Sequence, residues 1–391
     1  MSTGRTGTAG PDAGRRALVE SRLREFHGVG VDDILEIIGY LREPGDTVFA
    51  GGSLSFGLGN RLSDFDVVVC GPRNSTSKVP LQHWAKTLRV DVWTRAGADI
   101  DRVFAQAEAA LARTTPIAGA FGTVEEEQQL KLLHRVAFGL HLDGPALSSA
   151  LEPGGGPDRD FAAVARDLVV REYAERMRES AYVARLAAGS GRWLAATVNA
   201  REAVEEAMHV LLAAWGVPFT GDKWLHERLK THAPDLREAY RRFAALPAAG
   251  PGCARFVADA VELCTELTGL DLDPEGLGRH LAWVAEGLAL HTVGPVPLLL
   301  APRVGGLWEL SARDRAAWDE LSARARPAAG TDPASHTAWP GAGLEPDQAE
   351  LCLGLYERGL VALVWDRGVP VTELAMPDRA GGTGGTGRES A

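Results

Sequence analysis

The sequence has few cysteines, no long hydrophobic segment and fewer basic than acidic residues. Its cysteines are scattered and form no C-x-x-C pair, which excludes a zinc ribbon or a disulfide framework and indicates a reducing cytoplasm. The longest apolar runs, such as that around 296–301, fall short of the roughly 18 residues that a membrane span needs. Residues 1–16 lack the apolar core of a secretory signal. We therefore expect a cytoplasmic protein without a membrane partner. The four cysteines are Cys70, Cys253, Cys264 and Cys352.

The charge balance argues against a nucleic-acid partner. The chain has 41 Lys and Arg against 52 Asp and Glu, a formal net charge of −11. Residues 295–375 alone contain seven basic and eleven acidic residues. Binding to DNA or RNA relies on basic side chains that release counterions from phosphates, so this composition predicts no such partner.

At about 150 residues per domain, a chain of 391 residues has room for two or three domains. Residues 1–15 are predicted to be a disordered arm, and residues 16–150 a first domain that mixes helices and strands. Its predicted helices are 17–41, a short one after Ser53, 99–113 and 124–139; its predicted strands are 47–50, 64–70 and 88–94.

After a Gly/Pro-rich linker at 152–158 the pattern becomes helical. Residues 158–292 are predicted to be an all-helical domain, with helices at 161–188, 192–215, 223–229, 253–267 and 274–290. Residues 293–376 follow as a small module with helices at 311–324 and 346–357, a loop at 327–344 and strands at 360–365 and 369–374. A helix before a two-stranded hairpin is typical of a winged helix. The tail, 377–391, is of low complexity. The predicted class is α+β: a mixed sheet, a helical bundle and a winged-helix-like end.

A strand that ends in Gly51-Gly52-Ser53 predicts a phosphate site. Glycine lets the backbone approach a ligand closely, and a helix start offers unpaired N–H groups to an anion. Ser53 can cap that helix. We expect these three residues to bind the phosphates of a nucleotide.

Three aspartates in the following strands predict a metal site. Asp64 and Asp66 share one face of a strand, because residues two apart in a strand point the same way. Asp91 lies within the next strand. If the two strands pair, the three carboxylates converge, and hard oxygen ligands suit Mg²⁺. Two Mg²⁺ ions and an NTP fit such a set. Taken one by one, each aspartate could equally be a solvated or edge residue.

This ordered set resembles the DNA polymerase β-like nucleotidyltransferase superfamily. Gly52-Ser53 and Asp64-Phe65-Asp66-Val67 correspond to its two-part signature, and Asp91 to its third carboxylate. The resemblance covers roughly residues 30–145. It implies Ser53 on the nucleotide phosphates, Asp64 and Asp66 on Mg²⁺, and Asp91 as metal ligand or base. Phe56 departs from the pattern, because many small-molecule members have Arg or Tyr there.

The helical region is similar, more loosely, to the substrate domain of kanamycin-type aminoglycoside nucleotidyltransferases and to the related HEPN fold. That resemblance implies a lysine on the phosphates, for which Lys223 is the candidate, and often a carboxylate base, for which Glu202 and Glu205 are candidates. The alternative for all three is a solvated charged face.

The sequence thus favours Mg²⁺-dependent transfer of a nucleoside monophosphate, with ATP as the expected donor and AMP as the expected group, to a small-molecule acceptor. Pyrophosphate is released. One alternative is an inactive nucleotidyltransferase fold that serves as a binding, antitoxin-like or scaffold protein. Another is nucleotidylation of a peptide or protein. The acceptor and the oligomeric state are left open.

Overall fold

A computed structural model describes residues 11–72, 74–113, 126–145, 160–217, 222–248, 250–286, 288–293, 296–301, 306–327 and 336–377. The chain forms two compact units. The first comprises the residues up to Arg113, Ile117–Val169 and Gly216–His232; the second comprises Val170–Trp215 and the residues from Ala233 onward. The predicted linker at 152–158, most of the predicted arm and nearly all of the tail lie outside the described residues.

The first unit is built on a five-stranded mixed sheet in the order β3-β4-β2-β1-β5. Strand β2 is parallel to β4, and the other neighbours are antiparallel. The predicted strands are confirmed as β1, β2 and β4, whereas β3 and β5 were not predicted. The strands are β1 (Thr47–Gly51), β2 (Phe65–Gly71), β3 (Leu81–Ala85), β4 (Leu88–Ala96) and β5 (Leu140–Asp143).

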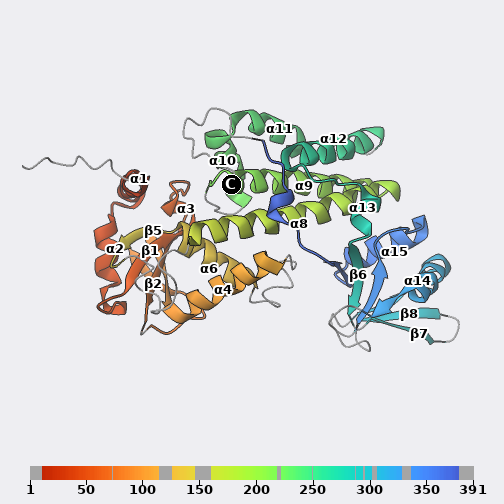
Figure 1. Ribbon diagram of the computed structural model, residues 1–391, viewed down its shortest axis with the longest axis horizontal. Helices are drawn as coiled ribbons and strands as arrows, with labels where there is room; N and C mark the ends of the chain where they lie inside the picture. The colour runs from red at the N-terminus through yellow and green to blue at the C-terminus, as the bar shows by residue number, and fades with distance from the viewer. Residues whose placement is uncertain are drawn as a thin grey trace, which may run out of the picture. The chain divides into compact units, whose positions relative to one another are not determined.

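Helices cover both faces of this sheet (Figure 1). Odd-numbered β2 residues such as Phe65 and Val67 pack with Leu23 and Ile34 from the two N-terminal helices. Even-numbered ones such as Val68 pack on the opposite face, with Phe104 among other side chains.

The helix predicted over 17–41 is two helices in the structure. The interruption lies at 28–30, where Gly28 has a positive φ of 66°. The helices are α1 (Pro11–His27), α2 (Val31–Ile37), η1 (Gly39–Leu41), α3 (Gly52–Ser55), α4 (Gly97–Arg113) and α6 (Glu126–Phe138).

The second unit begins with the long helices of the predicted bundle. Helix α8 runs from the first unit into the second, and α12 packs along α9. The short segment before and including α10 belongs to the first unit instead. These elements are α8 (Phe161–Gly189), α9 (Trp193–Ala214), η2 (Asp222–Trp224), α10 (Leu225–His232), α11 (Pro234–Ala244), α12 (Pro251–Thr268) and α13 (Pro274–Gly278).

The helix predicted over 274–290 is wrong beyond its first turn. Helix α13 ends at Gly278, and β6 (Leu281–Glu286) and β7 (Ala289–Val293) follow. The helical pattern misled because a short apolar run such as Leu-Ala-Trp-Val-Ala fits a buried strand equally well. Trp283 in β6 is fully buried.

The C-terminal part forms two sheets in place of a two-stranded wing. Strand β12 pairs with β6 in the order β10-β11-β6-β12, and β7-β8-β9 form a second sheet. The strand predicted at 369–374 is wrong: residues 371–373 are a 3₁₀ turn. Part of the predicted loop, His336–Pro340, is strand β11. The helices at 311–324 and 346–357 are confirmed. The elements are β8 (Val296–Ala301), β9 (Gly306–Glu309), α14 (Ala312–Arg324), β10 (Arg326–Pro327), α15 (Pro346–Tyr356), β12 (Val361–Trp365) and η4 (Val371–Glu373).

In the part of the chain that the structure describes, no helix has the length and apolar character that crossing a membrane requires.

Candidate functional site

The sheet of the first unit brings two of the predicted aspartates side by side. Asp66 of β2 is the register partner of Asp91 in the parallel strand β4 and of Gly51 in the antiparallel strand β1. Register partners point to the same face of a sheet. Asp66 and Asp91 therefore share the face opposite Phe65 and Val90, which pack in the core on the α1–α2 side.

Arg89 connects the remaining aspartate to this pair. Its guanidinium forms an ion pair with Asp64 and lies 3.3 Å, Nε to Oδ1, from Asp91. The hydrogen bond that Arg89 donates to Asp64, with the nearby carboxylates, holds the pKa of Arg89 above its usual value. The Arg89 guanidinium thus contacts both Asp64 and Asp91, the two other aspartates of the predicted metal site.

Asp66 has its own partners, from α6 and β4. Arg135 Nη2 lies 3.0 Å from Asp66 Oδ1, and the Trp93 indole N–H donates to the same oxygen at 3.4 Å. Burial raises the pKa of Asp66, and the nearby charges of Asp64 and Asp91 raise it further, while Arg135 opposes the shift. Burial is the largest of these effects, so the fold favours the neutral form of the Asp66 carboxyl more than water does.

The donor set fits a hard divalent cation in its chemistry. Asp91 is buried, and its Oδ1 accepts no hydrogen bond from the residues that the structure describes. A carboxylate oxygen that has an ion-pair contact with Arg89 but no hydrogen bond, beside a second carboxylate on the same face, suits a cation that prefers oxygen ligands. However, no three His, Cys, Asp or Glu side chains among the described residues are arranged to hold a metal ion. The Mg²⁺ assignment to Asp64, Asp66 and Asp91 stays a prediction.

Gly51 and Gly52 bring the backbone against this carboxylate face. Gly52 has φ +75°, and a Cβ added there would lie 2.5 Å from Asp66 Oδ2. A Cβ at Gly51 would lie 2.8 Å from Cγ of Arg135. Both positions therefore require glycine, for reasons of space and, at Gly52, of backbone conformation.

Ser53 follows within a single helical turn. The N-cap of α3 is Gly51, so the expected cap role of Ser53 is wrong. Its side chain is buried, and its hydroxyl forms no hydrogen bond with the described residues, while its carbonyl accepts from Phe56 and Gly59. The hydroxyl is therefore available to a ligand.

A cavity of about 430 Å³ opens beside Asp64. One part of its wall comes from the loop between α3 and β2, and the other from Lys223 and Trp224 of η2. Lys223 Nζ lies 5.7 Å from the centre of the Trp224 ring. The structure thus places the predicted phosphate lysine and the first predicted metal ligand on one cavity within the first unit. The lining residues are Asn60, Leu62, Ser63, Asp64, Lys223 and Trp224.

Three arginines at the site were not singled out from the sequence. Arg89 and Arg135 pair with the aspartates, and Arg15 of α1 stacks on the Phe56 ring at 4.5 Å while donating to the Ser55 carbonyl. Arg15 thus brings a cation next to the position where Phe56 departs from the family pattern. Arg89 could have been found from its spacing, since it shares a strand face with Asp91.

The glutamates suggested as bases lie in the second unit. Glu205 accepts from Tyr240 at 3.3 Å and pairs with Arg201 at 3.6 Å. Glu202 is partly buried, which raises its pKa. Neither contact involves a residue of the aspartate site.

Comparisons with known proteins give little beyond this geometry. No protein family and no curated protein matches the chain. Among solved structures it is similar to a nucleotidyltransferase-like protein from Exiguobacterium sibiricum 255-15, with 12% identity and a TM-score of 0.31 over 63% of this chain and 74% of that one. At such similarity the site residues must carry any functional conclusion, and the resemblance to kanamycin-type enzymes stays a prediction.

Proposed function

We propose that the first unit is a nucleotidyltransferase that moves a nucleoside monophosphate from an NTP to a small-molecule acceptor and releases pyrophosphate. ATP is the expected donor. The observation that carries the proposal is the row formed by Gly51, Asp66 and Asp91 across β1, β2 and β4. It sets a glycine turn with a free serine hydroxyl against two carboxylates on one sheet face.

Each part of this row has a role in the proposed reaction. The backbone at Gly51 and Gly52 approaches the phosphates, and the Ser53 hydroxyl donates to a phosphate oxygen. Lys223, across the cavity from Asp64, neutralises phosphate charge. Asp91, whose buried Oδ1 accepts no hydrogen bond within the described residues and faces only the ion-pair contact with Arg89, orients the acceptor hydroxyl or amine and accepts its proton.

Asp64, Asp66 and Asp91 would hold the divalent cations. Mg²⁺, when bound, supplies neutralisation of the phosphate charge that develops during transfer. The residues themselves supply position: Arg135 and Trp93 fix the orientation of the Asp66 carboxylate through Oδ1.

An inactive nucleotidyltransferase fold is the second candidate, and one observation favours it. Arg89 and Arg135 already pair with all three aspartates. A fold that had exchanged metal binding for internal ion pairs would show this arrangement. The two candidates differ in one property: an enzyme exchanges Arg89 for a divalent cation when NTP is present, whereas an inactive fold does not.

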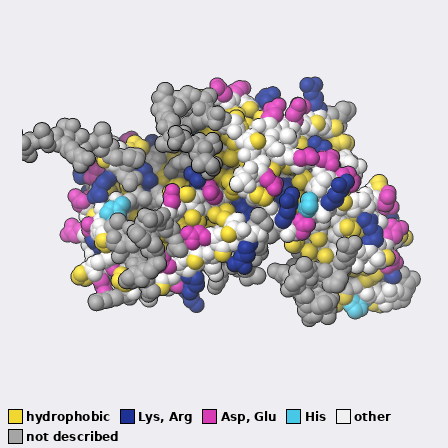
Figure 2. Space-filling model, in the orientation of Figure 1, with side chains coloured by type: hydrophobic (Ala, Val, Ile, Leu, Met, Phe, Trp, Pro, Cys, Tyr) yellow, Lys and Arg dark blue, Asp and Glu magenta, His cyan; other side chains and the backbone are white. Residues whose placement is uncertain are grey.

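We expect no nucleic-acid acceptor, consistent with the acidic composition. On the face drawn in Figure 2, Asp and Glu side chains lie among the Lys and Arg side chains. Helix α15, which would have preceded a wing, has Asp347 and Glu350 paired with Arg313. A peptide or protein acceptor is the remaining alternative to a small molecule.

The test is to incubate the full-length protein with Mg²⁺ and each NTP in turn, against a panel of hydroxyl and amino compounds, a peptide mixture and oligonucleotides. Pyrophosphate release and intact mass are measured. The proposal expects pyrophosphate and a nucleotidylated small molecule. Absence of NTP binding with Mg²⁺ would support the inactive fold, and extension of an oligonucleotide would contradict the choice of acceptor.

A further inference from the structure

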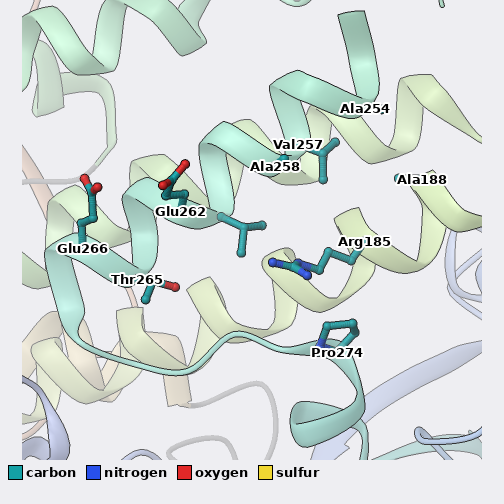
Figure 3. Close-up of a pocket in the computed structure, with 10 residues that line it drawn as sticks. Arg185, Ala188, Ala254, Val257, Ala258, Glu262, Thr265, Glu266 and Pro274 are labelled. Carbon is teal, nitrogen blue, oxygen red and sulfur yellow. The ribbon is translucent and has the colours of Figure 1, made fainter. Parts of the chain in front are cut away.

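A second cavity lies in the second unit, and none of the residues that line it was assigned a role above. It has a volume of about 540 Å³, within the range of about 300–1,000 Å³ that small-molecule sites occupy. Helix α12 packs along α9, and the cavity lies where another side of α12 meets α8 and the start of α13. Figure 3 shows the residues that line it.

The wall from α12 is one apolar helix face that ends in a hydroxyl. Ala254, Val257, Ala258, Val261 and Thr265 recur at intervals of three or four residues, which places them on one side of the helix. Val257 and Val261 are buried, whereas the two alanines are exposed to the cavity. Small side chains at these positions are what leaves the space open.

Arg185 is the one basic side chain among the lining residues. It reaches from α8 into the space below α12, on the side of Thr265 and Val257 (Figure 3). It is half-buried, and within the described residues it forms no ion pair or hydrogen bond. Most arginines of the neighbouring turns, such as Arg176 and Arg178, have acceptors. A half-buried guanidinium without an acceptor, facing apolar walls, suits an anionic group attached to a hydrocarbon body.

The charges of the other lining residues indicate which kind of anion the cavity can bind. Glu262 and Glu266 line the cavity from the other side of α12 (Figure 3), so its lining has two negative charges against one positive. That balance disfavours a phosphate, which carries up to two charges, and a nucleotide, which carries more. A carboxylate carries one charge and matches the planar fork of arginine with two hydrogen bonds.

We propose that this cavity binds a small monocarboxylate with a short hydrocarbon body. Its carboxylate pairs with Arg185, its hydrocarbon part lies on Val257 and Val261, and Thr265 can donate to a carboxylate oxygen. The site is independent of the nucleotidyltransferase proposal, because it shares no residue with the aspartate site.

The experiment is ligand-observed NMR on the full-length protein with butanoate, hexanoate and octanoate, beside hexanamide, inorganic phosphate and hexyl phosphate as probes. We expect saturable hexanoate binding with a Kd on the order of 1 mM, as fits a ligand of this size. Hexanamide and inorganic phosphate should bind at least about fivefold more weakly, because neither combines a single carboxylate charge with an apolar body.

Four variants distinguish binding at this site from non-specific binding. Arg185→Gln should weaken hexanoate binding by about fivefold or more, and Arg185→Lys should restore part of it. Ala258→Trp, at an exposed position, should fill the cavity and abolish binding. Arg255→Gln changes an exposed arginine on the same helix, paired with Asp259, and should have no effect.

The proposal is overturned if no carboxylate saturates in the wild type, if Arg185→Gln and Ala258→Trp bind like the wild type, or if hexyl phosphate binds as tightly as hexanoate. The last result would show that the cavity binds anions in general and does not select a carboxylate. Thermal unfolding of each variant shows whether it is folded, and the two variants act through different atoms, so a fold defect in one leaves the other as the test.

Discussion

Gly52 lies directly against Asp66: a Cβ at position 52 would be 2.5 Å from Asp66 Oδ2. This contact couples the glycine turn to the carboxylate face. We predict that Gly52→Ala displaces the Asp66 side chain and reduces NTP turnover by on the order of 100-fold, the cost of misplacing a reacting group by about 1 Å. Steady-state pyrophosphate release measures it.

Gly45→Ala is the matched control for this substitution. Gly45 also has a positive φ, +97°, but its Cβ would meet no atom within 4 Å. It should cost about 1 kcal/mol of stability through backbone strain and leave turnover unchanged. Equal losses of turnover in the two variants would mean that strain, and not the contact with Asp66, explains the effect.

Arg89 competes with a cation for Asp64 and Asp91 if the site binds metal. Removing its charge in Arg89→Gln should then tighten Mn²⁺ binding about three- to tenfold, since it removes a positive charge adjacent to the ligands. Isothermal titration of Mn²⁺ measures the change. Arg102→Gln, which removes an exposed arginine paired with Asp99, is the control. Weaker Mn²⁺ binding in Arg89→Gln would show that Arg89 organises the site and does not compete.

Lys223 is predicted to contact the NTP phosphates. Lys223→Ala should raise KM for NTP about three- to tenfold with a smaller change in kcat, because the lysine neutralises phosphate charge in both the bound and the transition state. Lys230→Ala, an exposed lysine of α10 paired with Glu227, should leave KM unchanged. An unchanged KM in Lys223→Ala would mean that this lysine does not contact the phosphates and belongs to a solvated charged face.

Glu206 of α9 makes stability depend on pH. Burial raises its pKa from 4.5 to about 8, and Glu202 and Glu179 add to the shift, while Ser180 and Arg176 oppose it. Between these two values the folded protein keeps the carboxyl neutral while the unfolded chain ionises it. The fold therefore loses stability as pH rises from about 5 to 8.

Glu206→Gln should remove this contribution. We expect little change in Tm at pH 5 and a higher Tm than wild type at pH 8.5, measured by differential scanning calorimetry. Glu25→Gln, at an exposed position of α1 without an ion pair among the described residues, should shift neither value. A lower Tm of Glu206→Gln at pH 8.5 would show that the charged carboxylate is stabilised in the fold.

The sequence predicted the parts of the fold whose patterns are local. Each of the strands β1, β2 and β4 contains valine, a residue typical of strands, and the sequence pattern marks where the strand ends. The long helices of the second unit have sustained apolar periodicity. Strand β3 was missed because Leu81–Ala85 is an edge strand with mostly exposed side chains. The wing was predicted wrongly because β12 pairs with β6, about 80 residues earlier, and a hairpin cannot be told from such a distant pairing by local pattern.

For the candidate site, too, the sequence predicted the local features and missed the contacts between distant segments. Gly51, Gly52, Asp64, Asp66 and Asp91 were found because they follow one another in a short stretch with a meaningful order. The partner of Asp66 was not found, because Arg135 comes from a helix 69 residues further along the chain. Which cation of a chain meets which carboxylate depends on the tertiary fold.

The most direct test of the central claim is NTP turnover of Asp66→Asn and Asp91→Asn beside Asp32→Asn, an exposed aspartate of α2. The change keeps size and removes the charge that a metal or an acceptor proton needs. Our account predicts that wild type and Asp32→Asn release pyrophosphate with Mg²⁺, that both site variants fall by about 100-fold or more, and that Asp66→Asn keeps or raises Tm because a buried charge is removed. Wild-type turnover in both site variants would contradict it.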